Sequence, residues 1–414
     1  MAGRRCCKIF EVKDGIGMNK MLGSPFVAEN SPISAENRAV IRRICEEEAA
    51  KPWSIPAGDE PLDERRMKRV RFTYDELQEQ PDKVAETLRE ERESIREAAK
   101  HLCQRPIKRV YLTGCGDSMA VMQGVRCFLE EVLEVTCEDM QALDFAYYDN
   151  KNVDEDTLVI MLSSSGETMR TLECMYVAQA KGAQTLTLSN TPTSTMMRES
   201  TRGLTIHASR KGWPTQSSTA AMAMLVQLGI DMARERGYDG KKLDAFQAEL
   251  DAMPELMRKV TADCEPEVKR WAAHLADKSI YLFVGGGPSY SCAFFGAAKI
   301  KEATPNYAIL VPLEEFHHYN TLKAGDPAIV IAPKGNSVPR AYETLVSARN
   351  FGGEGYVVTT EGEDVLASEA AGAILLPEIT EFFSGLVYSI PVQMFGYYVA
   401  MEKYNRALAE AEGK

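Results

Sequence analysis

The sequence has no run of about 18 apolar residues, the length that a membrane-spanning helix needs, so no membrane span is expected. It begins with a basic stretch, Met1 to Cys7, but no apolar signal-peptide core follows. Its ten cysteines are scattered, and no two have the C-x-x-C spacing of a zinc or redox site. We interpret them as reduced, buried thiols, which favours the cytoplasm. No His/Cys/Asp cluster has metal-ligand spacing, so neither a metal nor a cofactor is expected.

Positive charge is scarce relative to negative charge. The chain has 48 lysines and arginines against 60 aspartates and glutamates, a net charge of −12. This balance argues against nucleic-acid binding as the main function. It does not exclude the binding of an anionic small molecule, because backbone amides and hydroxyls at a helix N-terminus can hold a phosphate without any arginine. The complete G-x-G-x-x-G fingerprint is also missing, so NAD binding is not expected.

What the chain does contain is a repeated order of strand, glycine turn and helix. The 414 residues predict two or three domains. Short apolar runs predict buried strands at 110–113, 158–162, 185–188, 280–284 and 329–332. Strands that alternate with helices imply mostly parallel sheets covered on both faces. Gly114 and Gly285 are 171 positions apart, and Gly166 and Gly335 are 169 apart, which indicates an internal duplication.

The expected domain organisation has three zones. Residues 1–71 are predicted to form an irregular arm with one helix near 34–50, followed by a first domain at 72–262 and a second at 263–414. Thr73 and Glu76 have the spacing of a capping box, and Pro81 suits the first turn of a helix that continues to Leu102. A helix is expected after each glycine turn, and further helices at 217–236, 241–260 and 386–408, with a linker near 262–266.

The strand-to-helix turns are where a ligand is expected, because open parallel sheets bind ligands beyond the carboxyl ends of their strands. Ser163 to Thr168 follows one predicted strand, and its hydroxyls stand beside free helix amides, which suits a phosphate monoester. A serine-rich helix cap with no ligand has the same appearance. The turn from Gly114 to Ser118 follows a neighbouring strand and adds a second small-residue turn.

A second group of polar residues lies in the later half. Lys299 and Glu302 share a helix face, and a carboxylate in a partly dry pocket can take a proton next to a carbonyl. A nearby histidine can open a sugar ring or move a proton between hydroxyls. The alternative is a surface ion pair with two packing histidines. The group comprises Lys299, Glu302, Glu314, Glu315, His317 and His318.

These motifs together resemble those of sugar isomerase (SIS) domains. Gly114-Cys115-Gly116-Asp117-Ser118 and Ser163-Ser164-Ser165-Gly166-Glu167-Thr168 are similar to the two signature turns in the isomerase half of glucosamine-6-phosphate synthase. Gly285 to Tyr290, Ala298 to Glu302 and Glu314 to His318 resemble that enzyme's second SIS domain in order and spacing. The likeness covers roughly residues 73–402. It implies an α/β chain with two tandem SIS domains, each a mostly parallel sheet flanked by helices in a flavodoxin-like, three-layer arrangement.

The resemblance also implies roles for single residues. Ser118, Ser163, Ser165 and Thr168 match phosphate-holding positions, and Ser164 matches a position that contacts the sugar. Asp117 stands among the substrate-binding positions where the synthase usually has threonine. Glu302 matches the base that moves a proton between C1 and C2, with Lys299 in the same pocket. His318 matches a ring-opening histidine that reaches in from a partner subunit, which implies a homodimer or larger homo-oligomer.

Departures from the synthase pattern narrow the expected activity. The chain shows no amidotransferase domain ahead of the SIS pair, its Lys211 to Gln216 loop differs, and it ends at Lys414 without the synthase's sugar-binding lysine. The similar fructosamine-6-phosphate deglycases keep the Glu and His and split a ketoamine phosphate into a sugar phosphate and an amine. That activity is the leading prediction. An aldose–ketose isomerase, an ammonia-dependent aminosugar-phosphate enzyme and a non-catalytic sugar-phosphate sensor are the alternatives.

Overall fold

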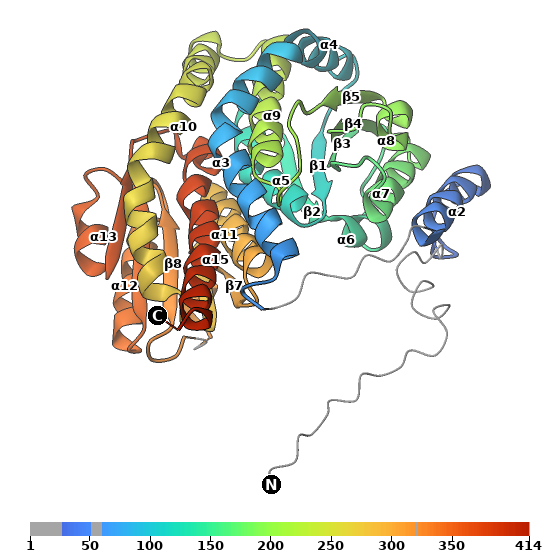
Figure 1. Cartoon of the computed structure of the whole chain (residues 1–414). Coiled ribbons are helices and arrows are strands. Elements are labelled where there is room, and N and C mark those ends of the chain that lie inside the picture. Colours follow the sequence, from blue (N-terminus) through green and yellow to red (C-terminus); the bar gives the residue numbers. More distant parts are fainter. Residues whose placement is uncertain (1–26, 51–59, 320–321, 414) are drawn as a thin grey trace.

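The chain folds around two parallel five-stranded sheets, each built from one half of the sequence (Figure 1). The computed structural model describes residues 27–50, 60–319 and 322–413. The first sheet has the order β2-β1-β3-β4-β5 and the second β10-β9-β8-β6-β7, which is the same order viewed from the other edge. The strands are β1 (Arg109–Gly114), β2 (Thr136–Gln141), β3 (Thr157–Leu162), β4 (Gln184–Ser189), β5 (Arg202–Thr205), β6 (Ile280–Gly285), β7 (Tyr307–Pro312), β8 (Pro327–Ala332), β9 (Glu354–Thr360) and β10 (Gly372–Leu376). The repeated order confirms both the predicted fold class and the duplication.

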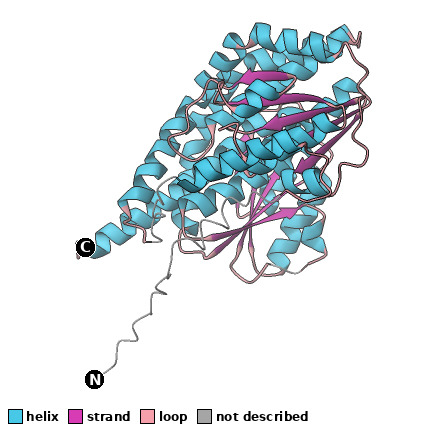
Figure 2. Cartoon of the chain, turned by 90° about the vertical axis from the view of Figure 1, so that its right-hand side faces the viewer, coloured by secondary structure: helices cyan, strands magenta, loops and turns pink. Residues whose placement is uncertain are grey.

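Helices surround both groups of strands, as Figure 2 shows. In chain order they are α2 (Ala35–Ala50), α3 (Glu64–Glu90), α4 (Arg92–Leu102), α5 (Asp117–Leu133), α6 (Ala142–Tyr147), α7 (Met169–Ala180), α8 (Thr195–Glu199), α9 (Gln216–Glu235), α10 (Gly240–Leu275), η1 (Gly287–Ser289), α11 (Tyr290–Ala303), η2 (Glu315–His317), α12 (Val338–Asn350), α13 (Asp364–Glu369), η3 (Glu381–Phe383), α14 (Ser384–Val387) and α15 (Ser389–Ala411). Among the described residues, none of these helices is long and apolar enough to cross a membrane.

The central strands are buried on both faces, which explains why they stand out in the sequence as unbroken apolar runs. All six residues of β3 are buried, and so are all six of β8. The five strands predicted from the sequence are confirmed as β1, β3, β4, β6 and β8. One continuous hydrophobic core joins the halves, because α5 and α9 of the first half pack in the same cluster as α10, α11 and α15. The two halves therefore meet along helices.

The prediction of a helix start at Thr73 to Pro81 is wrong. The helix α3 begins at Glu64, where Asp63 accepts bonds from two backbone amides, and Pro81 lies inside it. The buried stripe Met67, Val70, Leu77 and Val84 explains this, because its burial outweighs the backbone bond that Pro81 cannot make. The helix interruption falls instead at Glu91, between α3 and α4.

The predicted linker at 262–266 is also helical. It lies within the 36-residue helix α10, whose buried Met257, Val260, Cys264 and Val268 continue one apolar face across the segment. The domain limits at residues 72 and 263 therefore remain a proposal, with α10 crossing the second one. The predicted helix at 34–50 is confirmed as α2, whereas the rest of the arm up to residue 59 lies outside the described residues or is irregular. The expected C-terminal helix is interrupted at Tyr388, between α14 and α15.

Candidate active site

A cavity of about 280 Å³ lies beyond the carboxyl ends of β1 and β3. It is open to solvent on one side, and polar side chains form most of its wall. Residues from both halves contribute to it, because Glu302 belongs to α11 and the remainder to the first half. The lining residues are Cys115, Asp117, Ser118, Leu162, Ser164, Ser165, Thr168, Arg210, Pro214, Ser217, Ser218 and Glu302.

The turn between β3 and α7 forms one wall of this cavity. Gly166 has a φ of +64°, and an added Cβ would collide with the side chain of Ser194, so the tight turn requires glycine. The Ser163 hydroxyl accepts a bond from the Gly166 amide at 3.0 Å and lies 2.8 Å from the Thr168 hydroxyl. Ser163 is buried and shapes the turn from behind, whereas Ser165 and Thr168 line the cavity, as does the neighbouring Ser164.

Two further helix starts point at the same space. The turn after β1 brings Ser118 to the wall, and Gly114 permits this because a Cβ there would lie only 2.8 Å from the Ser118 Cβ. The first turn of α9 contributes Ser217 and Ser218. The N-terminal amides of a helix carry a partial positive charge and lack partners within the helix. Three such ends with hydroxyls beside them favour a phosphate.

A buried lysine joins two carboxylates that line the cavity. The Lys299 Nζ donates to the Asp117 carboxylate at 2.7 Å and also to Glu302. The side chain of Lys299 is 2% exposed, that of Asp117 9% and that of Glu302 28%. The helix α15 seals this arrangement at Gly396, where a Cβ would come within 2.7 Å of the Lys299 Cβ. The alternative prediction of a surface ion pair between Lys299 and Glu302 is therefore wrong. Lys299, Asp117 and Glu302 form a nearly buried triad, in which Glu302 is the most exposed member.

This geometry shifts the pKa values of Glu302 and Lys299. Burial raises the pKa of Glu302 above its usual value, and Lys299 offsets part of the rise while Asp117 adds to it by repulsion. Burial by itself lowers the pKa of Lys299, but the attraction of Asp117 and Glu302 outweighs it, so the net shift is upward. Lys299 therefore stays an ammonium ion, and Glu302 has the character of a carboxylate that accepts a proton more readily than an exposed one does.

The histidine predicted to open the sugar ring lies elsewhere in this chain. His318 follows η2 at the surface, with 58% of its side chain exposed, and it is not among the residues that line the cavity. Its ring bonds Glu314 at 3.0 Å, and Glu314 also pairs with Arg340. The neighbouring His317 is turned inward against Thr344 at 2.9 Å, and burial lowers its pKa. A contribution of His318 to the cavity therefore requires a second copy of the chain.

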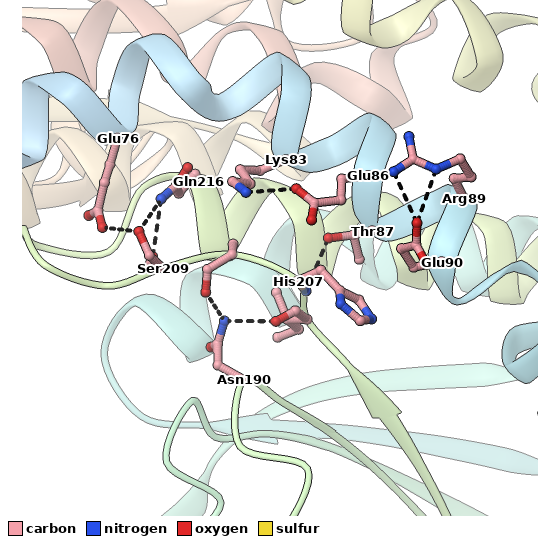
Figure 3. A network of polar contacts seen from close by, with 12 residues as sticks. Glu76, Lys83, Glu86, Thr87, Arg89, Glu90, Asn190, His207, Ser209 and Gln216 are labelled. Atoms are coloured by element: carbon pink, nitrogen blue, oxygen red, sulfur yellow. Dashed lines mark hydrogen bonds and ion pairs between the residues drawn. The ribbon is translucent and has the colours of Figure 1, made fainter.

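Sequence reasoning missed Arg210 and the start of α9 as parts of the site. The segment before α9 is fastened to α3, as the contacts in Figure 3 show. Glu76 accepts from the Ser209 hydroxyl at 2.8 Å, and Gln216 donates to that same hydroxyl at 2.9 Å. The backbone amide of His207 donates to the Thr87 hydroxyl at 3.2 Å. The signal in the sequence was the hydroxyl-rich run at Gln216 to Thr219, which has the composition of the two turns already recognised.

Metal ligands do not gather in the described residues: no group of three His, Cys, Asp or Glu side chains there could hold an ion. The carboxylates nearest the cavity are occupied by Lys299 instead.

Comparison with known proteins places this fold and cavity in a family. The model of the SIS domain matches residues 105–230 and 274–403. A glutamine–fructose-6-phosphate aminotransferase of Thermus thermophilus is 30% identical over 344 residues, which cover 80% of this chain and 56% of the relative. The enzyme of the same description from Neisseria meningitidis is 28% identical over 344 residues, with the same coverage. The chain thus spans about half the length of these curated relatives.

Solved structures show the same fold. The C-terminal domain of glucosamine-fructose-6-phosphate aminotransferase from Francisella tularensis superposes with a TM-score of 0.71 at 22% identity, over 80% of this chain and 96% of that one. A glucosamine-6-phosphate deaminase from Thermotoga maritima gives a TM-score of 0.59 at 17% identity, over 80% and 94%. The resemblance predicted from the motifs is confirmed. With two matched regions that make up more than half of its length, the chain belongs to the SIS domain family.

Proposed function

We propose that the chain is an enzyme that moves a proton between C1 and C2 of a 6-phosphorylated sugar, with Glu302 as the base. The observation that carries this proposal is the position of Glu302, a carboxylate of raised pKa that lines the same cavity as the hydroxyls of Ser118, Ser165 and Thr168. The wall of one cavity thus combines hydroxyls that suit a phosphate with a base, so a bound sugar phosphate could present its carbonyl carbon region to Glu302.

Within this class we propose a ketoamine 6-phosphate of the fructosamine type as the substrate. Glu302 removes a proton from C1, and the electrons of that C–H bond form a double bond to C2 while the carbonyl electrons move to its oxygen. The nitrogen lone pair then forms a double bond to C1 as the proton returns to C2, and transfer of the N–H proton to the C2 oxygen gives an imine at C1 and a hydroxyl at C2. Water then adds to the imine and releases the amine, which leaves an aldose 6-phosphate. Lys299 keeps its proton throughout, so it orients the two carboxylates and does not form a covalent bond with the sugar.

The test compares Glu302→Gln with the wild type on fructosamine 6-phosphate, fructose 6-phosphate and glucosamine 6-phosphate. An amide cannot accept the proton, so turnover should fall about 100- to 10,000-fold while binding persists. Glu86→Gln is the matched control, since Lys83 and Glu86 form an ion pair of the same spacing at 2.6 Å and neither lines the cavity. Near-full turnover by Glu302→Gln would remove Glu302 as the base. A wild type that binds these sugars and turns over none is a sensor.

A further inference from the structure

Arg210 is the only lysine or arginine among the described residues that line the cavity. It has no hydrogen bond and no ion pair within the described part of the chain, although its neighbours on either side are bonded through their backbone or side chain. Partial burial and the like charge of Arg69 lower the pKa of Arg210, with a smaller opposite effect from Glu76. A guanidinium keeps its charge in proteins. The cavity therefore contains one permanent positive charge without an internal counter-ion in contact.

The backbone that bears Arg210 is held firmly in place. Glu76 of α3 accepts three bonds from this segment, and Thr73 accepts a fourth at its far end. Since several hydrogen bonds fix both sides of Arg210, its side chain starts from a defined point on the cavity wall. The four donors are the Ser209 hydroxyl at 2.8 Å, the Lys211 amide at 2.7 Å, the Gly212 amide at 3.1 Å and the Trp213 amide at 2.9 Å.

Arg210 and Glu302 both line the cavity. The positive charge of Arg69 lowers the pKa of both Glu302 and Arg210, so Arg69 is near both side chains. Its guanidinium lies 4.8 Å from the ring centre of Trp213, three residues after Arg210. Lys299 cannot serve a substrate in the same way. Its side chain is 2% exposed, and its ammonium group already bonds both Asp117 and Glu302.

Proton removal by Glu302 creates a charge that needs a partner. The proton moves from carbon to the carboxylate, and the substrate's carbonyl oxygen becomes an oxyanion in a cavity whose wall already contains the carboxylate of Asp117. Donors aimed at such an oxyanion typically contribute about 100- to 1,000-fold in rate. We propose that Arg210 donates to this oxyanion and stabilises the enediolate-like intermediate, as a catalytic residue in addition to Glu302. This inference rests on the proposed proton-transfer function.

The test measures two inhibitors that share a phosphate and differ in their head group. The hydroxamate of 5-phosphoarabinonate has an anionic head with the shape of an enediolate, and arabinitol 5-phosphate has a neutral one. Arg210→Met should weaken the hydroxamate about 100-fold or more and the alditol less than about 3-fold, with kcat falling in parallel to the hydroxamate. The hydroxamate affinity and kcat of Arg210→Lys, which keeps the charge, should lie between those of Arg210→Met and the wild type. Lys211→Met is the control, since Lys211 is exposed and does not line the cavity.

Each other result overturns the assignment. Equal weakening of both inhibitors would make Arg210 a phosphate ligand. If Arg210→Met leaves both inhibition constants unchanged and raises KM only for ketoamines that carry a carboxylate, Arg210 instead binds the amine part of the substrate. The proposed function fails separately, through a wild type that turns over none of the three sugar phosphates. If the wild type is active and binds the hydroxamate no more tightly than the alditol, only the role of Arg210 is refuted.

Discussion

Replacing Lys299 with methionine would leave two carboxylates that line the cavity, Asp117 and Glu302, without their shared cation. The Nζ of Lys299 and the Asp117 oxygen are 2.7 Å apart. At an effective dielectric constant of about 20, that attraction is roughly 6 kcal/mol, and much of it is offset by the cost of burying the lysine. Removing one partner of a buried pair typically costs about 3–5 kcal/mol, because the other charge stays buried. Glu302 keeps 28% of its side chain exposed, which favours the lower end.

The destabilisation of Lys299→Met should depend on pH in a definite direction. Without the lysine, the pKa values of the buried carboxylates rise in the folded state above their unfolded values of about 4. A group with a raised folded pKa costs nothing while it is protonated in both states, and its cost grows as pH rises above the unfolded pKa. The gap in stability between wild type and Lys299→Met should therefore be wider at about pH 8 than at about pH 5.

Thermal unfolding followed by circular dichroism would measure this gap. A loss of about 3–5 kcal/mol corresponds to about 3–6 °C if the whole chain unfolds as one unit. Lys301→Met is the matched control, as an exposed lysine two positions along the same helix. The double variant Lys299→Met/Asp117→Asn should recover part of the loss, because it removes one of the stranded charges. A variant as stable as Lys301→Met at the higher pH would show that the triad is open to water, contrary to its burial.

Three further outcomes are expected from the same site. Thr168→Ala should raise KM more than it lowers kcat, since phosphate contacts act equally on ground and transition states; equal use of phosphorylated and unphosphorylated sugar would contradict this. Asp117→Asn should move the acid limb of the kcat/KM profile to lower pH, because Asp117 raises the pKa of Glu302, and an unmoved limb speaks against the coupling. If each site combines Glu302 of one subunit with His318 of a two-fold partner, mixing inactive Glu302→Gln with inactive His318→Ala should restore up to roughly a quarter of the activity. A fully active monomer in sedimentation excludes that geometry.

The parts of the fold that the sequence predicted well are those set by local pattern. Strands such as β3 and β8 are unbroken apolar runs between glycine turns, so their place follows from the chain alone, whereas β2, β5, β7, β9 and β10 were not predicted. The start of α3 and the passage of α10 through residues 262–266 were missed, because Pro81 and Pro266 suggested boundaries. In both cases the burial of a long apolar face against the other half overrides the local signal, and that contact cannot be seen from neighbouring residues.

The candidate site was predictable only in part for a similar reason. The i,i+3 spacing places Lys299 and Glu302 on one helix face, but spacing alone cannot distinguish a solvated face from a buried one. Their burial depends on Asp117, which lies 182 positions earlier. Arg210 depends on a loop that Glu76 holds across 133 to 136 positions. Residues whose role arises from such distant contacts carry no local pattern, so only the folded chain brings them together.

The duplication provides a paired experiment on why the Ser163–Thr168 turn of the first half lines this cavity and the matching turn of the second half does not. In the second half Ser337 stands 169 positions after Thr168, and Gly335 matches Gly166. There the carboxylate of Glu381 packs against the turn, 2.3–2.6 Å from where a Gly335 Cβ would lie, and its Oε2 accepts from the Asn336 amide at 3.4 Å. An internal anion already occupies the turn that would otherwise receive a phosphate.

Ser337→Ala should therefore leave KM unchanged where Thr168→Ala raises it, and titration calorimetry with arabinitol 5-phosphate should find one site per chain. Two sites per chain, or matching effects of the two substitutions, would mean that Glu381 does not block the second turn.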